Sequence, residues 1–159
     1  MAVYLRVRLQ RFADRQPSFV RLAESILQAV GEAQSELSLE LVGDGRMRRL
    51  NRLYRRKDQT TDVLAFPMRE SSSPCPAILG DVVISVPTAY RQAHDAGRSL
   101  NDEVAVLLVH GVLHLCGYDH EKSDQEAARM RRRERAVLKA IGPAPRLMIR
   151  PASEKKRSR

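Results

Sequence analysis

The chain has 159 residues, a length that suits one compact domain, and 43% of them are hydrophobic, which is enough for one core. Aromatic residues make up 4% and Trp is absent, so the core must be built mainly from aliphatic side chains. No apolar run is long enough to span a bilayer, and the N-terminus lacks the apolar centre of a signal peptide. We therefore expect a cytoplasmic protein, and its two cysteines are too few for a disulfide framework.

The charge is strongly basic. There are 28 Lys and Arg against 19 Asp and Glu, a net charge of +9 and a pI near 10.2. Such a balance favours a polyanionic partner, most simply nucleic acid, although plain solubility is the alternative. The basic residues gather in three stretches: 46–57, 129–135 and 150–159. The last stretch, within a proline-containing segment from 143 to 159, is predicted to be a disordered tail that can hold RNA phosphates.

Two strands and a helix are predicted in the first part of the chain. Apolar and polar residues alternate over residues 3–9, which indicates a strand. An apolar stripe over residues 17–31 indicates a helix that ends at Gly31. Alternation returns over residues 36–42 and predicts a second strand.

The middle of the chain carries a basic helix and two further strands. Asp44 is predicted to cap a helix over residues 45–56. A short apolar run at 63–66 indicates a strand. Residues 78–86 are predicted to form a central strand, with Asp81 inside it.

Three helices are predicted in the remainder. The first runs from 88 to about 97. The second, over 100–116, is capped by Ser99, is apolar nearly all round and is therefore expected to be the central buried helix. Gly117 ends it, and a charged helix follows over 121–141.

Together these elements predict an α/β (α+β) fold. We expect a single layer of mixed sheet, about four strands, packed by about five helices, with the central buried helix carrying the functional residues. One domain covers residues 1–142, and the basic tail follows from 143 to 159.

Three of the four histidines lie in the segment HGVLHLCGYDH at 110–120. His110 and His114 are four residues apart, so a helix places both imidazoles on one face. Gly117 lets the chain reverse, and His120 can then return as a third ligand. Three neutral imidazoles leave the fourth tetrahedral position of one Zn²⁺ ion for water, whose pKa the ion lowers. Nickel and manganese remain alternatives.

The alternative for two histidines at this spacing is a pair of satisfied side chains. In an apolar helix, however, two buried imidazoles without a shared ligand would be costly. A further clue is the residue after His110. Zinc proteases of the H-E-x-x-H type have a glutamate there as general base, whereas this chain has Gly111. The sequence therefore favours a metal-dependent hydrolase over a protease.

The histidine segment resembles, residue for residue, the H-G-x-L-H-L-x-G-Y-D-H motif of the YbeY family of bacterial endoribonucleases. The segments LNRLYRRKDQTTDVLAFP (50–67) and LGDVVIS (79–85) are also similar to segments of that family, in the same order. Thr60 and Ala65 depart from its usual proline and serine. The resemblance covers residues 1–142 and does not extend to the tail.

The resemblance implies a mixed α/β fold and a zinc site made of His110, His114 and His120. It also implies a single-strand-specific endoribonuclease that acts on ribosomal RNA of the small subunit, notably the 3′ end of 16S RNA, with a role in ribosome quality control. Arg55 matches the functional arginine of the family. No organic cofactor and no membrane contact are expected, and the oligomeric state is left open.

The chemistry of Arg55 agrees with this role. A guanidinium is planar, stays charged and fits phosphate, so it can stabilise the charge that builds during phosphodiester cleavage. The alternative is one more solvated charge on a basic helix. Asp119 could orient a ligating ring, and Tyr118 could stack on a base. Asp81 lies in an apolar strand and needs a partner, either a helix N-terminus or a buried histidine. Structural hydrogen bonding or packing is the alternative for these three residues.

Two other functions stay open on the sequence. One is a ribosome-assembly binding factor whose zinc is structural. The other is a metallopeptidase or another zinc hydrolase, against which Gly111 and the positive charge both count.

Overall fold

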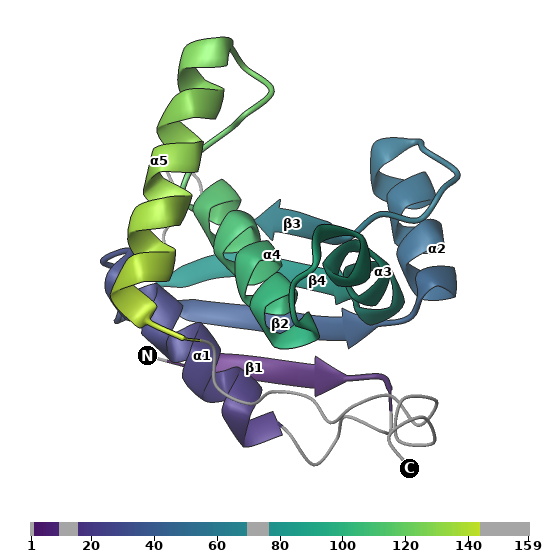
Figure 1. Cartoon of the computed structure of the whole chain (residues 1–159), viewed down its shortest axis with the longest axis horizontal. Coiled ribbons are helices and arrows are strands. Elements are labelled where there is room, and N and C mark those ends of the chain that lie inside the picture. The colour runs from purple at the N-terminus through teal and green to yellow at the C-terminus, as the bar shows by residue number, and fades with distance from the viewer. Residues whose placement is uncertain (1, 10–15, 70–76, 144–159) are drawn as a thin grey trace.

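A computed structural model describes residues 2–9, 16–69 and 77–143, and these residues form one four-stranded sheet with helices packed against it (Figure 1). The strands are β1 (Ala2–Val7), β2 (Glu36–Val42), β3 (Val63–Pro67) and β4 (Ile78–Ser85). Their order is β1-β2-β4-β3. β1, β2 and β4 are parallel, and the edge strand β3 is antiparallel to β4. The predicted mixed sheet is confirmed.

The helices divide between the two faces of the sheet. They are α1 (Gln16–Ala29), α2 (Asp44–Arg55), α3 (Val86–Ala96), α4 (Leu100–Leu115) and α5 (Asp124–Ile141). Side chains of α1, α3, α4 and α5 share the main core with one face of the sheet, and α4 lies in the middle of this layer (Figure 1). Of the described helices, only α2 packs on the other face, where Met47 and Leu50 meet β3 and β4 in a smaller cluster. Within the described ranges, four helices therefore cover one face of the sheet and one helix covers part of the other.

The burial of α4 follows from its composition. Ten of its residues are buried, on nearly every side of the helix. It contacts β3, β4, α1, α3 and α5, so it is the central helix that the sequence predicts. Ser99 caps it as expected, because the Ser99 hydroxyl accepts a hydrogen bond from the Asp102 backbone N–H at 3.1 Å.

A bulge in β4 sets which side chains face which side of the sheet. The pairing with β2 shifts at Glu36 and Leu37, so that Gly80 rather than Leu79 lies opposite Leu37. Gly80 has φ +148°, and a Cβ there would lie 2.4 Å from the Phe66 carbonyl oxygen, so only glycine fits. After the bulge, Val82 faces the main core and Asp81 faces the opposite side.

One predicted cap is wrong. Gly43, not Asp44, precedes α2, and its position makes no side-chain capping bond. Asp44 lies in the first turn instead, and its carboxylate accepts hydrogen bonds from four surrounding side chains: Thr60, Ser85, Thr88 and Arg91. Burial would raise the pKa of Asp44, but these hydrogen bonds outweigh burial and lower the pKa to about 2. The carboxylate therefore ties α2 to β4 and α3 rather than to its own helix.

The last helix starts later than predicted, at Asp124, because the Ser123 hydroxyl caps it by accepting from the Glu126 N–H. Residues 116–123 are thus a loop. None of the helices in the described ranges is long and apolar enough to cross a membrane. Apart from Pro143, the predicted basic tail lies outside the described residues.

Candidate metal centre

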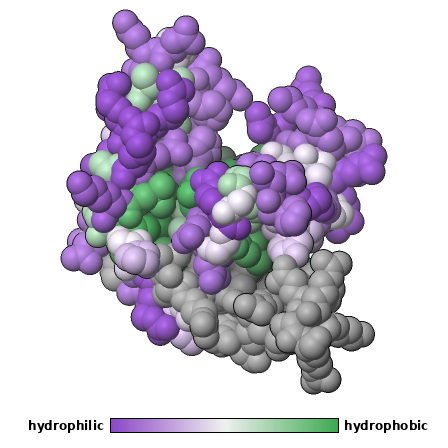
Figure 2. Space-filling view, viewed as in Figure 1, coloured by the Kyte–Doolittle hydropathy of each residue, from purple (hydrophilic) through white to green (hydrophobic). Residues whose placement is uncertain are grey.

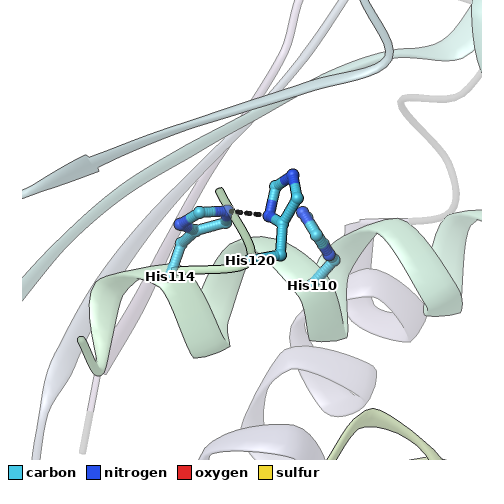
Figure 3. Close-up of side chains that lie close together, drawn as sticks. All are labelled: His110, His114 and His120. Atoms are coloured by element: carbon cyan, nitrogen blue, oxygen red, sulfur yellow. Dashed lines mark hydrogen bonds between the residues drawn. The ribbon is translucent and has the colours of Figure 1, made fainter. Parts of the chain in front are cut away.

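Three histidines converge at the C-terminal end of α4. His110 and His114 lie one turn apart on the same face of the helix, which ends at Leu115. Gly117, with φ +99°, lets the chain turn back, and His120 returns over the helix (Figure 3). The three ring centroids are 4.9, 5.0 and 5.2 Å apart, and one ring nitrogen from each residue lies within 4.8 Å of the others. This group can hold a metal ion.

The donor chemistry of the group suits a metal cation. Burial, and then the neighbouring His110 and His120, lower the pKa of His114, while Asp119 and Glu121 partly offset this effect. A lowered pKa favours the neutral imidazole, the form that donates a lone pair to a metal. The His114 Nε2 and His120 Nδ1 atoms are 3.2 Å apart, so both nitrogens point into the space between the rings.

A carboxylate that the sequence reasoning missed lies beside the group. Glu134 of α5 places its Oε1 atom 3.5 Å from the His110 Nδ1 atom, and the side chain is only 19% exposed. With Nδ1 directed at Glu134, the Nε2 atom of His110 remains available for a ligand. The only available signal was that Glu134 is the single acid within the arginine-rich stretch 129–135.

The histidines lie in a cleft of about 830 Å³. Its wall is formed by the end of α2, by β3, by the loop after α4 and by α5. The surfaces of α5 and α2 rise as two hydrophilic walls on either side of a hollow in Figure 2. Arg55, the last residue of α2, lines the same cleft, and its Nη2 atom lies 3.6 Å from the Glu121 Oε1 atom. The fold thus brings Arg55 to the histidines from a point 55 residues earlier than His110 in the chain.

The structure also explains Gly111. A Cβ at this position would lie 2.8 Å from the Val82 Cγ1 atom and 3.3 Å from the Val63 Cγ2 atom. The Cβ direction at residue 111 is therefore toward the sheet, where α4 packs against β3 and β4. Gly111 also lines the cleft, but a side chain at this position would collide with Val82 unless the helix or the strand shifted, and the glutamate of the H-E-x-x-H proteases is absent.

Comparison with known proteins places the chain in a family. A family model described as endoribonuclease YbeY matches residues 8–142. This chain belongs to the YbeY family. It is 46% identical over 138 residues to the endoribonuclease YbeY of Aquifex aeolicus, covering 87% of this chain and 91% of that protein. It is 44% identical over 141 residues to that of Geobacter metallireducens, covering 87% and 94%.

A solution structure of a Thermotoga maritima protein supports the fold. Its TM-score is 0.62 at 22% sequence identity, over 87% of this chain and 88% of that one. The comparison therefore supports the arrangement of helices and strands. The assignment of residues to the cleft is based on the geometry of this chain alone.

The three other residues singled out in the sequence have different surroundings. Asp119 lines the cleft, and its carboxylate accepts a hydrogen bond from the Glu121 N–H at 2.9 Å, which shapes the turn that carries His120. Tyr118 also lines the cleft, and its ring packs under the Arg129 guanidinium at 4.6 Å. Asp81 is not in the cleft, because the bulge in β4 turns it to the opposite face of the sheet.

Two further acidic residues, Glu103 and Asp62, line the cleft. Glu103 of α4 is 4% exposed. Burial raises its pKa, the Arg98 guanidinium partly offsets that effect, and Asp62 raises it again. Asp62 itself is held by the Gln92 amide and by the Val63 N–H. Glu103 lies seven residues before His110 on α4, and Asp62 directly precedes β3.

Proposed function

We propose that this protein is a zinc-dependent, single-strand-specific endoribonuclease. The observation that carries the proposal is the convergence of His110, His114, His120 and Arg55 in one cleft of a YbeY-family chain. The relatives bear the name endoribonuclease, and the basic charge of +9 suits an RNA substrate. The proposal includes a cytoplasmic location.

In this proposal one zinc ion is held by His110, His114 and His120. When bound with three imidazoles, zinc supplies a Lewis acid with one open position, able to polarise a phosphate oxygen or to acidify a water. Glu134 orients the His110 ring through its Nδ1 atom, and Asp119 holds the turn of His120. Tyr118 limits the cleft beside the histidines.

Arg55 supplies the fixed positive charge of the site. Its guanidinium binds the non-bridging oxygens of the scissile phosphate, where negative charge builds as the P–O bond breaks. Without substrate, the guanidinium lies beside the exposed carboxylate of Glu121. Binding of a phosphate therefore replaces a weak, solvent-screened contact with a charge-assisted one.

The substrate is proposed to be ribosomal RNA, notably the 3′ end of 16S RNA in the small subunit, with a role in ribosome quality control. This part of the proposal rests on the resemblance of the histidine motif and of the segment 50–67. The charge of α2 and of the stretch 129–135, on the two sides of the cleft, supports a long polyanion rather than a small substrate.

The test compares the purified protein with two histidine variants on a single-stranded RNA that contains the 16S 3′ end. For His114→Ala we expect loss of bound zinc, measured by elemental analysis, and at least about 100-fold slower cleavage. His94→Ala is the matched control, because His94 is exposed near the end of α3 and does not line the cleft. It should keep both the metal and the activity.

Other outcomes separate the competing functions. Equal cleavage by wild type and His114→Ala would remove the metal from the chemistry. Maturation of ribosomes in cells by a folded His114→Ala protein would favour an assembly factor with structural zinc. Peptide release that chelation abolishes would favour a peptidase, although Gly111 faces the sheet.

A further inference from the structure

A second hollow lies on the face of the sheet opposite the histidines. It has a volume of about 530 Å³ and is lined by all four strands and by α2. Register places four of its residues in one cross-strand row, Tyr4 on β1, Ser38 on β2, Asp81 on β4 and Phe66 on β3. Three strand spacings of about 4.8 Å make this row roughly 14 Å long. We call this feature the sheet groove.

Exposed aromatic and apolar side chains gather in the sheet groove. Tyr4 is 60% exposed, Tyr54 is 61% exposed and Met68 is 56% exposed, and all three line it. They are three of the five large hydrophobic residues that are exposed in the described ranges. A clustering of this kind on one surface marks a binding site more often than a chance distribution does.

The ring of Tyr54 is held in place. It meets Phe66 edge to face, with centroids 5.0 Å apart and an interplanar angle of 63°. The contact restrains Tyr54 although most of the residue stays exposed. A restrained and exposed ring is a suitable platform for stacking a nucleobase.

The sheet groove adjoins the metal cleft. Tyr54 and Arg55 are neighbours in the last turn of α2, and Tyr54 lines the groove whereas Arg55 lines the cleft. The edge strand β3 separates the two hollows, with Phe66 lining the groove and Ala65 lining the cleft. One extended strand of nucleic acid could therefore pass around the end of α2 and occupy both.

The charges in the sheet groove suit bases on its floor and phosphates at its side. Glu40 is paired, because Arg46 and Arg8 both donate to its carboxylate. Burial would raise the pKa of Glu40, but these bonds outweigh burial and lower it. Arg6, in the next row, also lines the groove. The floor carries Asp81, for which the described residues provide no hydrogen-bond or ion-pair partner.

We propose that the sheet groove binds nucleobases of the single-stranded RNA that reaches the metal cleft. This inference rests on the proposed function and names a second part of the same substrate path. Tyr54 and Tyr4 stack on the bases, and Arg6 contacts the backbone. The Asp81 carboxylate accepts hydrogen bonds from amino groups of cytosine, adenine or guanine, which uracil lacks. A second copy of this chain, also charged +9, would be repelled.

The first test measures RNA binding by fluorescence anisotropy with labelled single-stranded oligonucleotides. A gel checks that the oligonucleotides remain uncleaved during the measurement. Tyr54→Ala should weaken binding about 10-fold, because one stacked base is lost. Tyr54→Phe keeps the ring and should bind as wild type does. Leu53→Ala is the matched control, since Leu53 is the adjacent residue, is 70% exposed and does not line the groove.

The second test measures base preference. Wild type should bind oligocytidine more tightly than oligouridine, and Asp81→Asn should reduce that ratio several-fold, because an amide can also donate to the uracil carbonyl. Tyr4→Ala should weaken binding of both sequences. If the groove binds bases by stacking alone, Asp81→Asn will leave this ratio unchanged. An unchanged ratio would therefore contradict the role assigned to Asp81.

The outcomes distinguish this inference from the proposed function. If wild type binds no RNA, the proposed function fails. If wild type binds RNA and Tyr54→Ala and Tyr4→Ala bind it equally well while remaining folded by circular dichroism, the groove inference is overturned. A concentration-dependent dimer that Tyr4→Ala abolishes would also overturn it and would assign the groove to a second copy of the chain.

Discussion

The two faces of the sheet differ in how completely they are covered. On one face α4 is buried among α1, α3, α5 and the strands, and its last turns hold the histidines in a packed frame. On the other face α2 is the only helix of the described part of the chain, and a row of partly exposed side chains crosses the strands. Metal ligands must be held within narrow limits, whereas a stacking surface for bases needs only exposed rings. The difference between the faces thus matches the proposed division between cleavage at the histidines and base recognition in the sheet groove.

Removing the metal should separate the two faces most strongly. Treatment with a chelator should slow RNA cleavage at least 100-fold, because the open Lewis-acid position is lost. RNA affinity should change less than about 3-fold, since the sheet groove contains none of the three histidines. Cleavage rates and RNA-binding anisotropy, measured on the same preparation before and after zinc is restored, check the expected effects on cleavage and on affinity. An equal loss of binding and cleavage would mean that the faces do not act separately.

Arg55 should show the next largest effect. Arg55→Ala should lower kcat/KM for single-stranded RNA about 100-fold, as loss of a fixed charge at the transition state does elsewhere. Arg55→Lys should recover only part of this loss, because a lysine cannot form the bidentate contact. Arg52→Ala, an exposed change one turn earlier on α2, is the control. A loss for Arg52→Ala as large as that for Arg55→Ala would reduce Arg55 to general basic charge.

Glu134 should have a smaller effect, and on the metal rather than on the RNA. Glu134→Gln should weaken zinc binding about 10-fold in competition with a chromogenic chelator, because the His110 ring loses its charged partner. RNA binding to the sheet groove should be unchanged. Glu126→Gln on the same helix is the control, because the Glu126 carboxylate pairs with Arg129 and with no other residue of the described ranges. Unaltered zinc affinity in Glu134→Gln would show that the contact with His110 is incidental.

Substitution of Asp44 should have the smallest effect of the four changes. It should affect both faces of the sheet alike, because α2 borders both the metal cleft and the sheet groove. Its pKa in the folded protein, about 2, is below the ordinary aspartate pKa of 3.8, so its stabilising effect is present above about pH 3.8 and is lost as the pH falls toward 2. Asp44→Asn should lower the free energy of unfolding by about 1 kcal/mol at pH 7, after allowance for solvent screening of this partly exposed group.

Urea unfolding of Asp44→Asn and wild type at pH 7 and at pH 3 checks this expectation. The gap between the two proteins should narrow at the lower pH. Asp58→Asn, which removes the exposed partner of Arg48, is the control and should change stability less. A gap that is the same at both pH values would show that the charge of Asp44 does not contribute.

Much of the local structure could be predicted because its causes lie within a few residues. Alternation of apolar residues identifies β2 with the correct bounds, and the apolar composition of residues 100–116 identifies α4 as the central helix. The spacing of His110 and His114, with Gly117 before His120, is likewise a local pattern that brings three rings together. Membership of the YbeY family was also accessible from these motifs.

The tertiary structure decided what depends on contacts between distant segments. Asp44 looked like a cap because its true partners, on the loop before β3, on β4 and on α3, are 16 to 47 residues away. Glu134 reaches His110 only through the packing of α4 against α5. Asp81 could not be assigned to a face until the bulge at Gly80 and the pairing with two strands were known. By itself, then, the sequence determined the elements, the histidine triad and the family. Packing determined which side of the sheet each remaining side chain faces, because that orientation depends on strand register and on contacts between distant segments, and no local sequence pattern specifies these.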